Sequence, residues 1–223
     1  MCGRFTLHSS VQSIADRFGL TAWSLGSISP RYNIAPTDMC LILTSSAQGI
    51  TSEYMEWGFI GNSGNKKKSF RIINCRSDKL TNIPGFLSSL QNRRCLVIAD
   101  GFYEWERNFS TLGPMYYQLQ DNSPFAFAGI WGHGIASSGN NVKRFSVITT
   151  GANTLIGQVH HRMPVILSEE SADAWLDQSK KNSLGLLSML IPFPSGSMQA
   201  YRVSRFVNRS GIDEKKAIEP VVN

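Results

Sequence analysis

The chain has 223 residues and a mass of 24.7 kDa, and 42% of its residues are hydrophobic and 17% charged. This balance excludes a disordered tail and a fibre, and the length suffices for one sizeable core. The 22 Lys and Arg outnumber the 16 Asp and Glu, which gives a net charge of +6. A basic chain favours a polyanionic partner, because neutralised phosphates release counterions.

Membrane and secretory functions are not expected. A membrane helix needs roughly 18 apolar residues, and the longest apolar runs, at 40–44 and 96–99, have the length of strands. The N-terminus lacks the charged and apolar regions of a secretory signal. We therefore expect a soluble protein of the cytoplasm.

The predicted elements begin with a helix over residues 10–18, with Ser9 or Ser10 as the N-cap and Gly19 as the stop. Further helices are predicted over 83–90, over 169–176 with Ser168 as the cap, and over 184–190. Strands are predicted over 39–44, 52–57, 71–74, 95–99, 102–106, 115–120, 125–131 and 145–150, and a polar loop over 61–69. Many short strands with few helices predict an α+β fold, with a mixed, largely antiparallel, barrel-like β-sheet core and a few flanking helices.

The four cysteines argue against a metal or disulfide framework. Cys2, Cys40, Cys75 and Cys95 form no C-x-x-C pair, and a cytoplasmic chain of this size rarely carries disulfides. Cys40 and Cys95 lie in apolar runs and are typical of buried core thiols. We expect neither a metal nor an organic cofactor.

Cys2 differs from the others because removal of Met1 would make it the N-terminus. An α-amine and a thiol then lie on adjacent carbons, where the amine condenses with an aldehyde and the thiol closes on the imine to give a thiazolidine. Such intramolecular closures reach effective molarities of order 10⁵ M. Alternatively, Cys2 is a chance residue at a frayed end of the chain.

Four further segments place polar side chains at expected turns or strand ends: Arg31-Tyr32-Asn33-Ile34-Ala35-Pro36, Ile73-Asn74-Cys75-Arg76-Ser77, Ala99-Asp100-Gly101-Phe102-Tyr103-Glu104-Trp105 and Val159-His160-His161-Arg162-Met163-Pro164. The first is typical of a turn. Together with Met1-Cys2-Gly3-Arg4-Phe5, these segments resemble the SRAP family of SOS response-associated peptidases, also called abasic-site processing proteins. The resemblance runs in family order from residue 2 to about Asn208, and it implies a single SRAP domain over residues 2–223.

The resemblance implies binding of single-stranded DNA and a covalent crosslink to abasic sites through Cys2, which shields the lesion during the DNA damage response. We accordingly expect a monomer that is associated with the nucleoid when it is bound to DNA. The family's catalytic Asn, Glu and His fall on Asn74, Glu104 and His160. Glu104 is suited to opening the sugar hemiacetal and moving the proton of the amine. His160 is suited to donating a proton near neutral pH, and Asn74 to orienting the amine or the sugar.

Four other positions match residues of the family that contact the DNA backbone, namely Arg4, Asn33, Arg76 and Arg162. Guanidinium groups suit phosphate oxygens. The Lys66–Lys68 run adds charge, and it is also typical of a solvated surface.

Each of these residues has a plainer interpretation. Glu104 fits the solvated face of a half-buried strand, and Asn74 fits an ordinary turn. His160 and His161 fit surface positions in a loop, and arginines commonly form structural ion pairs.

The chain also departs from the family pattern. Cys75 stands where Ala is usual, Asp78 where Glu is frequent, Ile98 where Pro is expected, and Gly61 where the family has Pro. The loop after the first Trp-Gly offers only Phe70 as an aromatic group to wedge against bases.

The leading hypothesis is a DNA-damage protein that captures abasic sites as thiazolidines, with lyase activity when the thiol fails to close. The alternative is a thiol-dependent peptidase, or self-processing peptidase, that uses Cys2 and His160. A single-strand binding module without chemistry is the third possibility.

Overall fold

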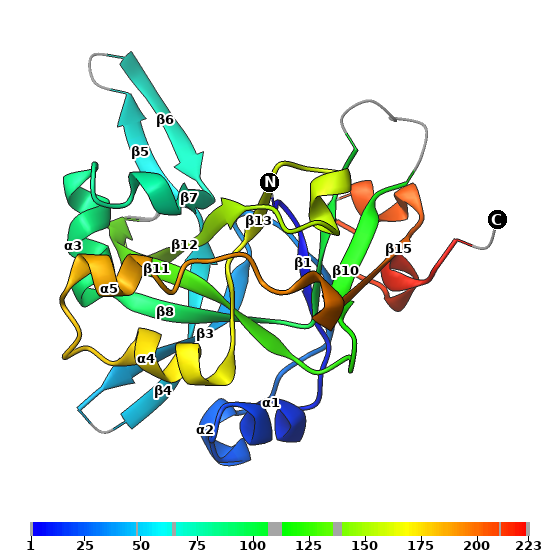
Figure 1. Cartoon of the computed structure of the whole chain (residues 1–223), viewed down its shortest axis with the longest axis horizontal. Coiled ribbons are helices and arrows are strands. Elements are labelled where there is room, and N and C mark those ends of the chain that lie inside the picture. Colours follow the sequence, from blue (N-terminus) through cyan, green and yellow to red (C-terminus); the bar gives the residue numbers. More distant parts are fainter. Residues whose placement is uncertain are drawn as a thin grey trace.

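A closed five-stranded β-barrel forms the centre of the computed structural model, which describes residues 2–47, 49–63, 66–106, 113–135, 140–209 and 211–221 (Figure 1). Around the barrel run β12 (Asn141–Gly151), β4 (Gly49–Trp57), β3 (Met39–Ser46), β8 (Arg94–Ala99) and β11 (Phe125–Ile135), and β11 pairs back with β12. Only the β12–β4 pair of this ring is parallel. The predicted mixed, largely antiparallel barrel is therefore confirmed.

Closure of the barrel depends on Gly129. This residue of β11 pairs with Val147 on β12 and with Cys95 on β8. A Cβ at this position would lie 2.8 Å from the Cys95 Sγ, so only glycine lets β11 approach both neighbours. Large aromatic side chains fill the interior nearby, where Trp57 stacks on Phe145 with ring centroids 6.3 Å apart.

Three short strands extend the barrel at its edges. β7 (Asn74–Arg76) pairs in parallel with β12, and β13 (Arg162–Pro164) pairs antiparallel with the same strand. β14 (Ile166–Leu167) pairs with β11. Because β7 and β13 both lie beside the final residues of β12, segments about 90 residues apart in sequence are brought together.

A second, antiparallel sheet lies against the barrel, in the order β15 (Met198–Arg202), β10 (Met115–Leu119), β9 (Gly101–Glu104), β1 (Phe5–Leu7) and β2 (Arg31–Ile34). The chain passes from β8 into β9 through Asp100, which is 3% exposed. Its carboxylate accepts hydrogen bonds from the backbone of His8, and from the Ser9 backbone and hydroxyl at 2.7 and 2.6 Å. Asp100 thus anchors the end of β1 at the junction between barrel and second sheet.

The helices begin where capping residues satisfy their first N–H groups. Ser10 accepts a hydrogen bond from Ser13 at the start of α1 (Val11–Arg17), and Ser168 does so from Ser171 at the start of α4 (Glu169–Leu176). The other helices are α2 (Ala22–Leu25), α3 (Pro84–Asn92) and α5 (Ser183–Leu187), with 3₁₀ turns η1 (Ser77–Lys79), η2 (Ile156–Gln158), η3 (Ser195–Ser197), η4 (Arg205–Asn208) and η5 (Lys215–Ile218). The four predicted helices are confirmed, with shifts at their ends.

Arg94 joins two of these helices from the first position of β8. It is 0% exposed, and its guanidinium donates to the carbonyls of Leu90 at 2.8 Å and Gln91 at 3.2 Å, in the last turn of α3. It also donates to the carbonyls of Trp175 at 2.5 Å and of Asp177, at the end of α4. The buried guanidinium thus provides hydrogen bonds for carbonyls at two helix C-termini, which have no partner within their own helices.

Three sequence predictions were wrong. Residues 61–63 and 66–69 do not form a loop, because β5 (Phe59–Ser63) pairs with β6 (Lys66–Ile72) in a hairpin that projects from the barrel in Figure 1. Residues 64 and 65 of this prediction lie outside the described residues. The turn-like segment 31–36 contains β2, which is held at the edge of the second sheet. The strand predicted over 71–74 is divided between β6 and β7 at Ile73, whose carbonyl accepts from the Trp57 indole at 2.9 Å and from the Val147 N–H at 3.1 Å.

Among the residues that the structure describes, no helix combines the length and the apolar character needed to cross a membrane.

Candidate active site

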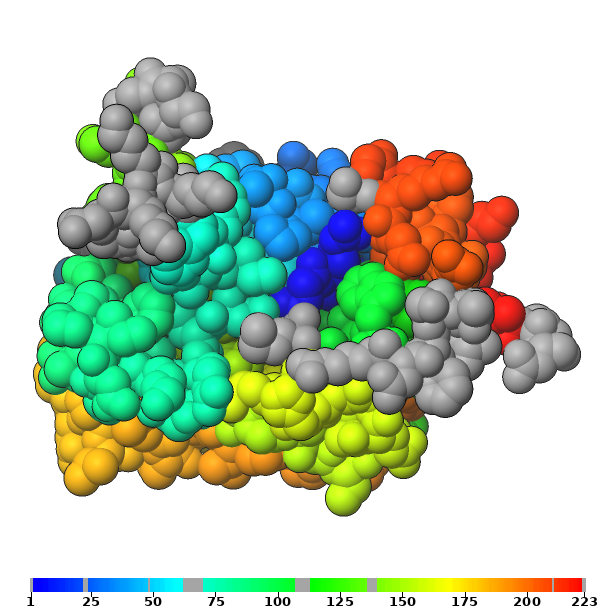
Figure 2. Space-filling model, turned by 90° about the horizontal axis from the view of Figure 1, so that it is seen from above, coloured from blue at the N-terminus to red at the C-terminus, as the bar shows by residue number. Residues whose placement is uncertain are grey.

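The start of the chain lies at the junction between the two sheets. Figure 2 shows the dark-blue N-terminal residues between the cyan, green and orange-red parts of the chain. Cys2 is 0% exposed, and its thiol lies 3.7 Å from the carbonyl oxygen of Arg4. The plainer interpretation of Cys2 as part of a frayed end is therefore wrong.

Asn74 holds the backbone of Cys2 from the barrel side. Its register opposite Val147 in β7 fixes its position, and its Nδ2 donates to the Cys2 carbonyl oxygen at 2.8 Å. The Asn74 Oδ1 is buried and has no hydrogen-bond partner among the described residues. An unsatisfied buried acceptor is costly, so this oxygen is available to a donor on a bound molecule or on the N-terminal amine.

Glu104 approaches from the second sheet, at the end of β9. The amide of its neighbour Tyr103 donates to the Arg4 carbonyl at 3.0 Å, which sets β9 beside the N-terminal segment. Glu104 is 3% exposed, so its interpretation as a residue of a solvated strand face is wrong. Burial, and next the charge of Glu104, raise the pKa of the Cys2 thiol far above its ordinary value. The thiol of Cys2 therefore keeps its proton at neutral pH.

His160 is buried as well, at 6% exposure, and it follows the 3₁₀ turn η2. Its Nδ1 lies 3.0 Å from the backbone nitrogen of Arg162 and 3.1 Å from the carbonyl oxygen of the same residue, so the tautomer of the ring sets which of the two contacts is a hydrogen bond. The ring stacks on His161 with centroids 4.4 Å apart. His161 alone fits the surface interpretation, because it is exposed whereas His160 is not.

Arg76 and Arg162 meet at one carboxylate, because β7 and β13 lie on either side of Thr149. Arg76 donates to both oxygens of Asp78, at 3.0 and 2.7 Å. The Nη1 of Arg162 lies 3.8 Å from the same carboxylate, and its other nitrogens donate to Thr149, whose Oγ1 lies at 3.0 and 3.2 Å. Burial, and next the charge of Arg76, lower the pKa of Arg162, while the hydrogen bond from Arg76 lowers the pKa of Asp78. The sequence interpretation missed Asp78 and Thr149 as partners, although Asp78 stands two residues after Arg76.

Arg4 and Asn33 form a third group, on the side of the second sheet. The Arg4 Nη1 donates to the Asn33 Oδ1 at 2.9 Å and to the Val207 carbonyl at 2.8 Å. Asn33 is 1% exposed, and its Nδ2 donates to the carbonyls of Val207, Arg209 and Ile212 at 3.2, 3.0 and 2.6 Å. The expected direct contact of Asn33 with DNA does not fit this burial. Its side chain instead holds Arg4 and the C-terminal segment in place.

Cys75 lies apart from this chemistry. It is 1% exposed, and burial raises the pKa of its thiol to about 12 despite a hydrogen bond from Ser146. Cys40 and Cys95 are also buried, as predicted. Cys75 is thus a core thiol on the strand that carries Asn74.

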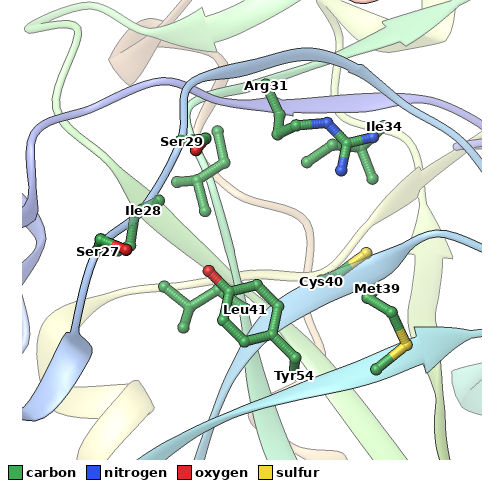
Figure 3. Close-up of a pocket in the computed structure, with 10 residues that line it drawn as sticks. Ser27, Ile28, Ser29, Arg31, Ile34, Met39, Cys40, Leu41 and Tyr54 are labelled. Carbon is green, nitrogen blue, oxygen red and sulfur yellow. The ribbon is translucent and has the colours of Figure 1, made fainter.

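A cavity of about 300 Å³ opens on another part of the molecule, between β2, β3 and β4 (Figure 3). Arg31, Cys40, Met39 and Tyr54 are among its lining residues, and none of the predicted site residues is. Within the described ranges, no three His, Cys, Asp or Glu side chains gather closely enough to hold a metal ion.

A family model described as SOS response associated peptidase (SRAP) matches residues 1–210. The chain belongs to the SRAP family. It is 34% identical over 222 residues to the abasic site processing protein YoqW of Bacillus subtilis (strain 168), covering 98% of this chain and 99% of that protein. It is 26% identical over 231 residues to the abasic site processing protein YedK of Escherichia coli (strain K12), covering 99% of this chain and 100% of that one.

The fold of this SRAP chain also has solved counterparts. A crystal structure of a protein from Bacteroides thetaiotaomicron superposes with a TM-score of 0.82 at 24% identity, covering 99% of this chain and 100% of that one. A phage-related protein from Bordetella bronchiseptica matches with a TM-score of 0.70 at 24% identity, covering 91% of this chain and 94% of that one.

Proposed function

We propose that this SRAP protein binds single-stranded DNA and captures the aldehyde of an abasic site as a thiazolidine on Cys2, after removal of Met1. The hydrogen bond from Asn74 to the Cys2 carbonyl carries this proposal, because it fixes the backbone of the very residue whose amine and thiol would react. The names of relatives such as YoqW and YedK, which are called abasic site processing proteins, support the choice of substrate.

The first step is attack of the Cys2 α-amine on the aldehyde carbon, which gives an imine and releases water. An α-amine has a pKa of ~7.7–8.0, so part of it is neutral and nucleophilic at physiological pH. The buried Glu104 carboxylate takes up and returns the protons that this condensation moves.

The thiol then adds to the imine carbon, forming the C–S bond of a five-membered ring while its proton passes to the nitrogen. Because the pKa of Cys2 is raised by burial and by Glu104, the thiol arrives protonated and needs a base. We assign that role to Glu104. Its negative charge disfavours a free thiolate, so its carboxylate takes the proton of the thiol while the C–S bond forms. The nitrogen finally holds the proton, so the ring is neutral.

His160 is assigned the opening of the sugar. An abasic deoxyribose is mostly a closed hemiacetal, and its ring oxygen must gain a proton as the C–O bond breaks. Because the backbone of Arg162 contacts Nδ1, we assign the donation of this proton to the Nε2 of His160. If the thiol fails to close, the imine can lose the 3′ phosphate by β-elimination, which gives the associated lyase activity.

Arg4, Arg76 and Arg162 are proposed to bind the DNA backbone. Arg76 is the most accessible of the three, with 52% of its side chain exposed. A phosphate would replace Asp78 as the partner of the Arg76 guanidinium. Arg162 has 11% of its side chain exposed and is held by Thr149, so it offers a fixed charge next to His160.

A peptidase using Cys2 and His160 is less well supported. A thiolate–imidazole nucleophile needs a lowered thiol pKa, whereas burial raises the pKa of Cys2. A binding module without chemistry does not account for a buried thiol, carboxylate and amide around one residue.

The test is the intact mass of the purified protein, alone and after mixing with a uracil-excised single-stranded oligonucleotide. We expect a free protein without Met1, and an adduct whose mass is the sum of protein and oligonucleotide minus water. Retention of Met1, or no covalent product while the abasic site stays intact, would overturn the thiazolidine mechanism.

A further inference from the structure

A second polar pocket lies next to the candidate active site, on the C-terminal segment. It has a volume of about 450 Å³ and is lined by Ser204, Arg205, Phe206, Asn208 and Arg209. Figure 2 shows this orange-red part of the chain beside the dark-blue N-terminal residues. None of the residues assigned above to chemistry or DNA binding lines the pocket.

The two arginines of the pocket differ from the other arginines of the site. Arg205 and Arg209 are exposed, and in the described part of the chain neither guanidinium has an ion pair or a hydrogen bond. Arg76 and Arg162, by contrast, share the carboxylate of Asp78. Two unpaired guanidinium groups in one concave surface form a site for an anion with more than one oxygen.

A third cation and an aromatic ring complete this surface. The ammonium group of Lys216 lies 5.7 Å from the ring centroid of Phe206, close enough for a cation–π contact. Positive charge next to an aromatic face is the combination that sites for single-stranded nucleic acids use, since phosphates meet the cations and bases or sugars meet the ring.

The backbone under the pocket is held rigidly. Ser204 accepts a hydrogen bond from the Phe206 N–H at 3.2 Å, and Val207 is buried at 0% exposure. The carbonyls of Val207 and Arg209 face inward to Asn33. Both carbonyl oxygens are thus taken up by Asn33, and neither is a partner of the Arg205 or Arg209 guanidinium.

Two hydrogen bonds tie the pocket to the reactive centre. The Trp105 indole donates to the Asn208 Oδ1 at 2.8 Å, and Trp105 directly follows Glu104. Arg4, two residues after Cys2, donates to the Val207 carbonyl at 2.8 Å. These two contacts place the segment that lines the pocket beside Arg4 and Trp105, which are near neighbours of Cys2 and Glu104 in the chain.

We propose that this pocket is a further subsite for the DNA backbone, in which Arg205 and Arg209 bind a phosphate on one side of the lesion and Phe206 contacts the adjoining sugar or base. The inference rests on the proposed function and adds to it a location for the flanking strand. It accounts for two unpaired arginines that the reaction itself does not use.

The test measures crosslinking rates below saturation with three oligonucleotides, one carrying several nucleotides on both sides of the abasic site and two shortened on the 5′ or the 3′ side. Wild-type protein is compared with Arg205→Ala, Arg209→Ala and the double variant. Lys180→Ala is the matched control, because Lys180 is an exposed cation between α4 and α5, which lie opposite the C-terminal segment in Figure 1. All of these side chains are exposed, so the variants should fold normally.

We expect the arginine variants to react more slowly with the full oligonucleotide, and to match the wild type on the one oligonucleotide that lacks the nucleotides bound by the pocket. Each substitution should also reduce the slope of log affinity against log salt by about 0.7 for single-stranded DNA. Rates like that of Lys180→Ala on every oligonucleotide, or an equal slowing on all three, would overturn the subsite.

The proposed function can fail separately from this inference. If wild-type protein forms no adduct even with the full oligonucleotide, the crosslinking chemistry is wrong. The salt slopes on an undamaged oligonucleotide then still decide the subsite, since unchanged slopes for both arginine variants would exclude a phosphate contact.

Discussion

The barrel and the second sheet bring different kinds of side chain to their junction. The barrel edge supplies the amide of Asn74 and the guanidinium groups of Arg76 and Arg162, on β7 and β13. The paired Arg76 and Asp78 side chains are half exposed there. The side of the second sheet supplies the thiol of Cys2 and the carboxylate of Glu104. These two residues are 0% and 3% exposed. Asn74 reaches across, from β7 to the Cys2 carbonyl.

Under the proposed function, this difference in exposure separates the residues that bind DNA from those that form the covalent bond. Charges that exchange with phosphates need access to solvent, because their partners arrive from solution. A thiol and a carboxylate that move protons benefit from a dry environment, in which each strongly affects the protonation of the other. Five substitutions test these assignments, in order of decreasing expected effect.

Cys2→Ala should have the largest effect, on the side of the second sheet. Without the thiol no thiazolidine can close, so we expect complete loss of heat-stable adduct and, in its place, a labile imine or a cleaved strand. Denaturing gels with and without heating measure this. A heat-stable adduct from Cys2→Ala would contradict the assignment of the nucleophile.

Glu104→Gln keeps the shape of the side chain and removes its basicity. General acid–base catalysis typically contributes 10²–10⁴-fold, so we expect crosslinking to slow by at least about 100-fold, while affinity for undamaged DNA stays unchanged. Glu106→Gln is the control, because Glu106 pairs with Arg202 at 2.7 Å outside the reactive centre. Equal rates for the two variants would exclude Glu104 as the base.

Arg162→Ala should act on binding, on the barrel side. We expect weaker affinity for all single-stranded sequences and a salt slope smaller by about 0.7, measured by fluorescence anisotropy at several salt concentrations. Arg17→Ala, which removes a surface cation paired with Glu169, serves as the control. A salt slope like that of the control would argue against a phosphate contact.

Asp78→Asn should have a smaller effect in the opposite direction. It removes the charge that competes with phosphate for Arg76 and Arg162, so DNA affinity should rise by a few-fold. The same anisotropy titrations measure it. Weaker binding by this variant would mean that Asp78 positions the arginines more than it competes for them.

Cys75→Ala should leave crosslinking unchanged and make the free energy of unfolding less dependent on alkaline pH. In the folded protein the pKa of Cys75 is raised from 9.0 to about 12. The native thiol therefore keeps its proton when the unfolded one loses it, and stability that is complete below pH 9 declines above it, by about 1.4 kcal/mol per pH unit. Denaturant unfolding between pH 8 and pH 11 should show a shallower decline in the variant, and identical slopes would contradict this.

Local signals predicted the helices well. Ser10 and Ser168 each stand at the start of an apolar helical pattern, and both cap their helices. The signal lies within a few residues, so tertiary structure has little to add. The hairpin β5–β6 was missed for the converse reason, since its polar residues show no alternation of apolar and polar positions.

The site residues could be selected from the sequence only by type and by family resemblance. Asn74 stands 72 residues from Cys2, and no local pattern predicts that its amide meets the Cys2 carbonyl. Asn33 shows the limit most clearly. Its partners Val207 and Ile212 lie 174 and 179 residues away, so its burial follows from chain topology alone.

Arg94 has a consequence for how the molecule fluctuates. A single guanidinium holds the last turns of α3 and α4, two helices far apart in the chain. An opening that frees the carbonyls of one helix also deprives the other of its anchor. The amide protons of both helix ends should thus exchange with solvent as one cooperative unit, linking the two helices through one buried side chain.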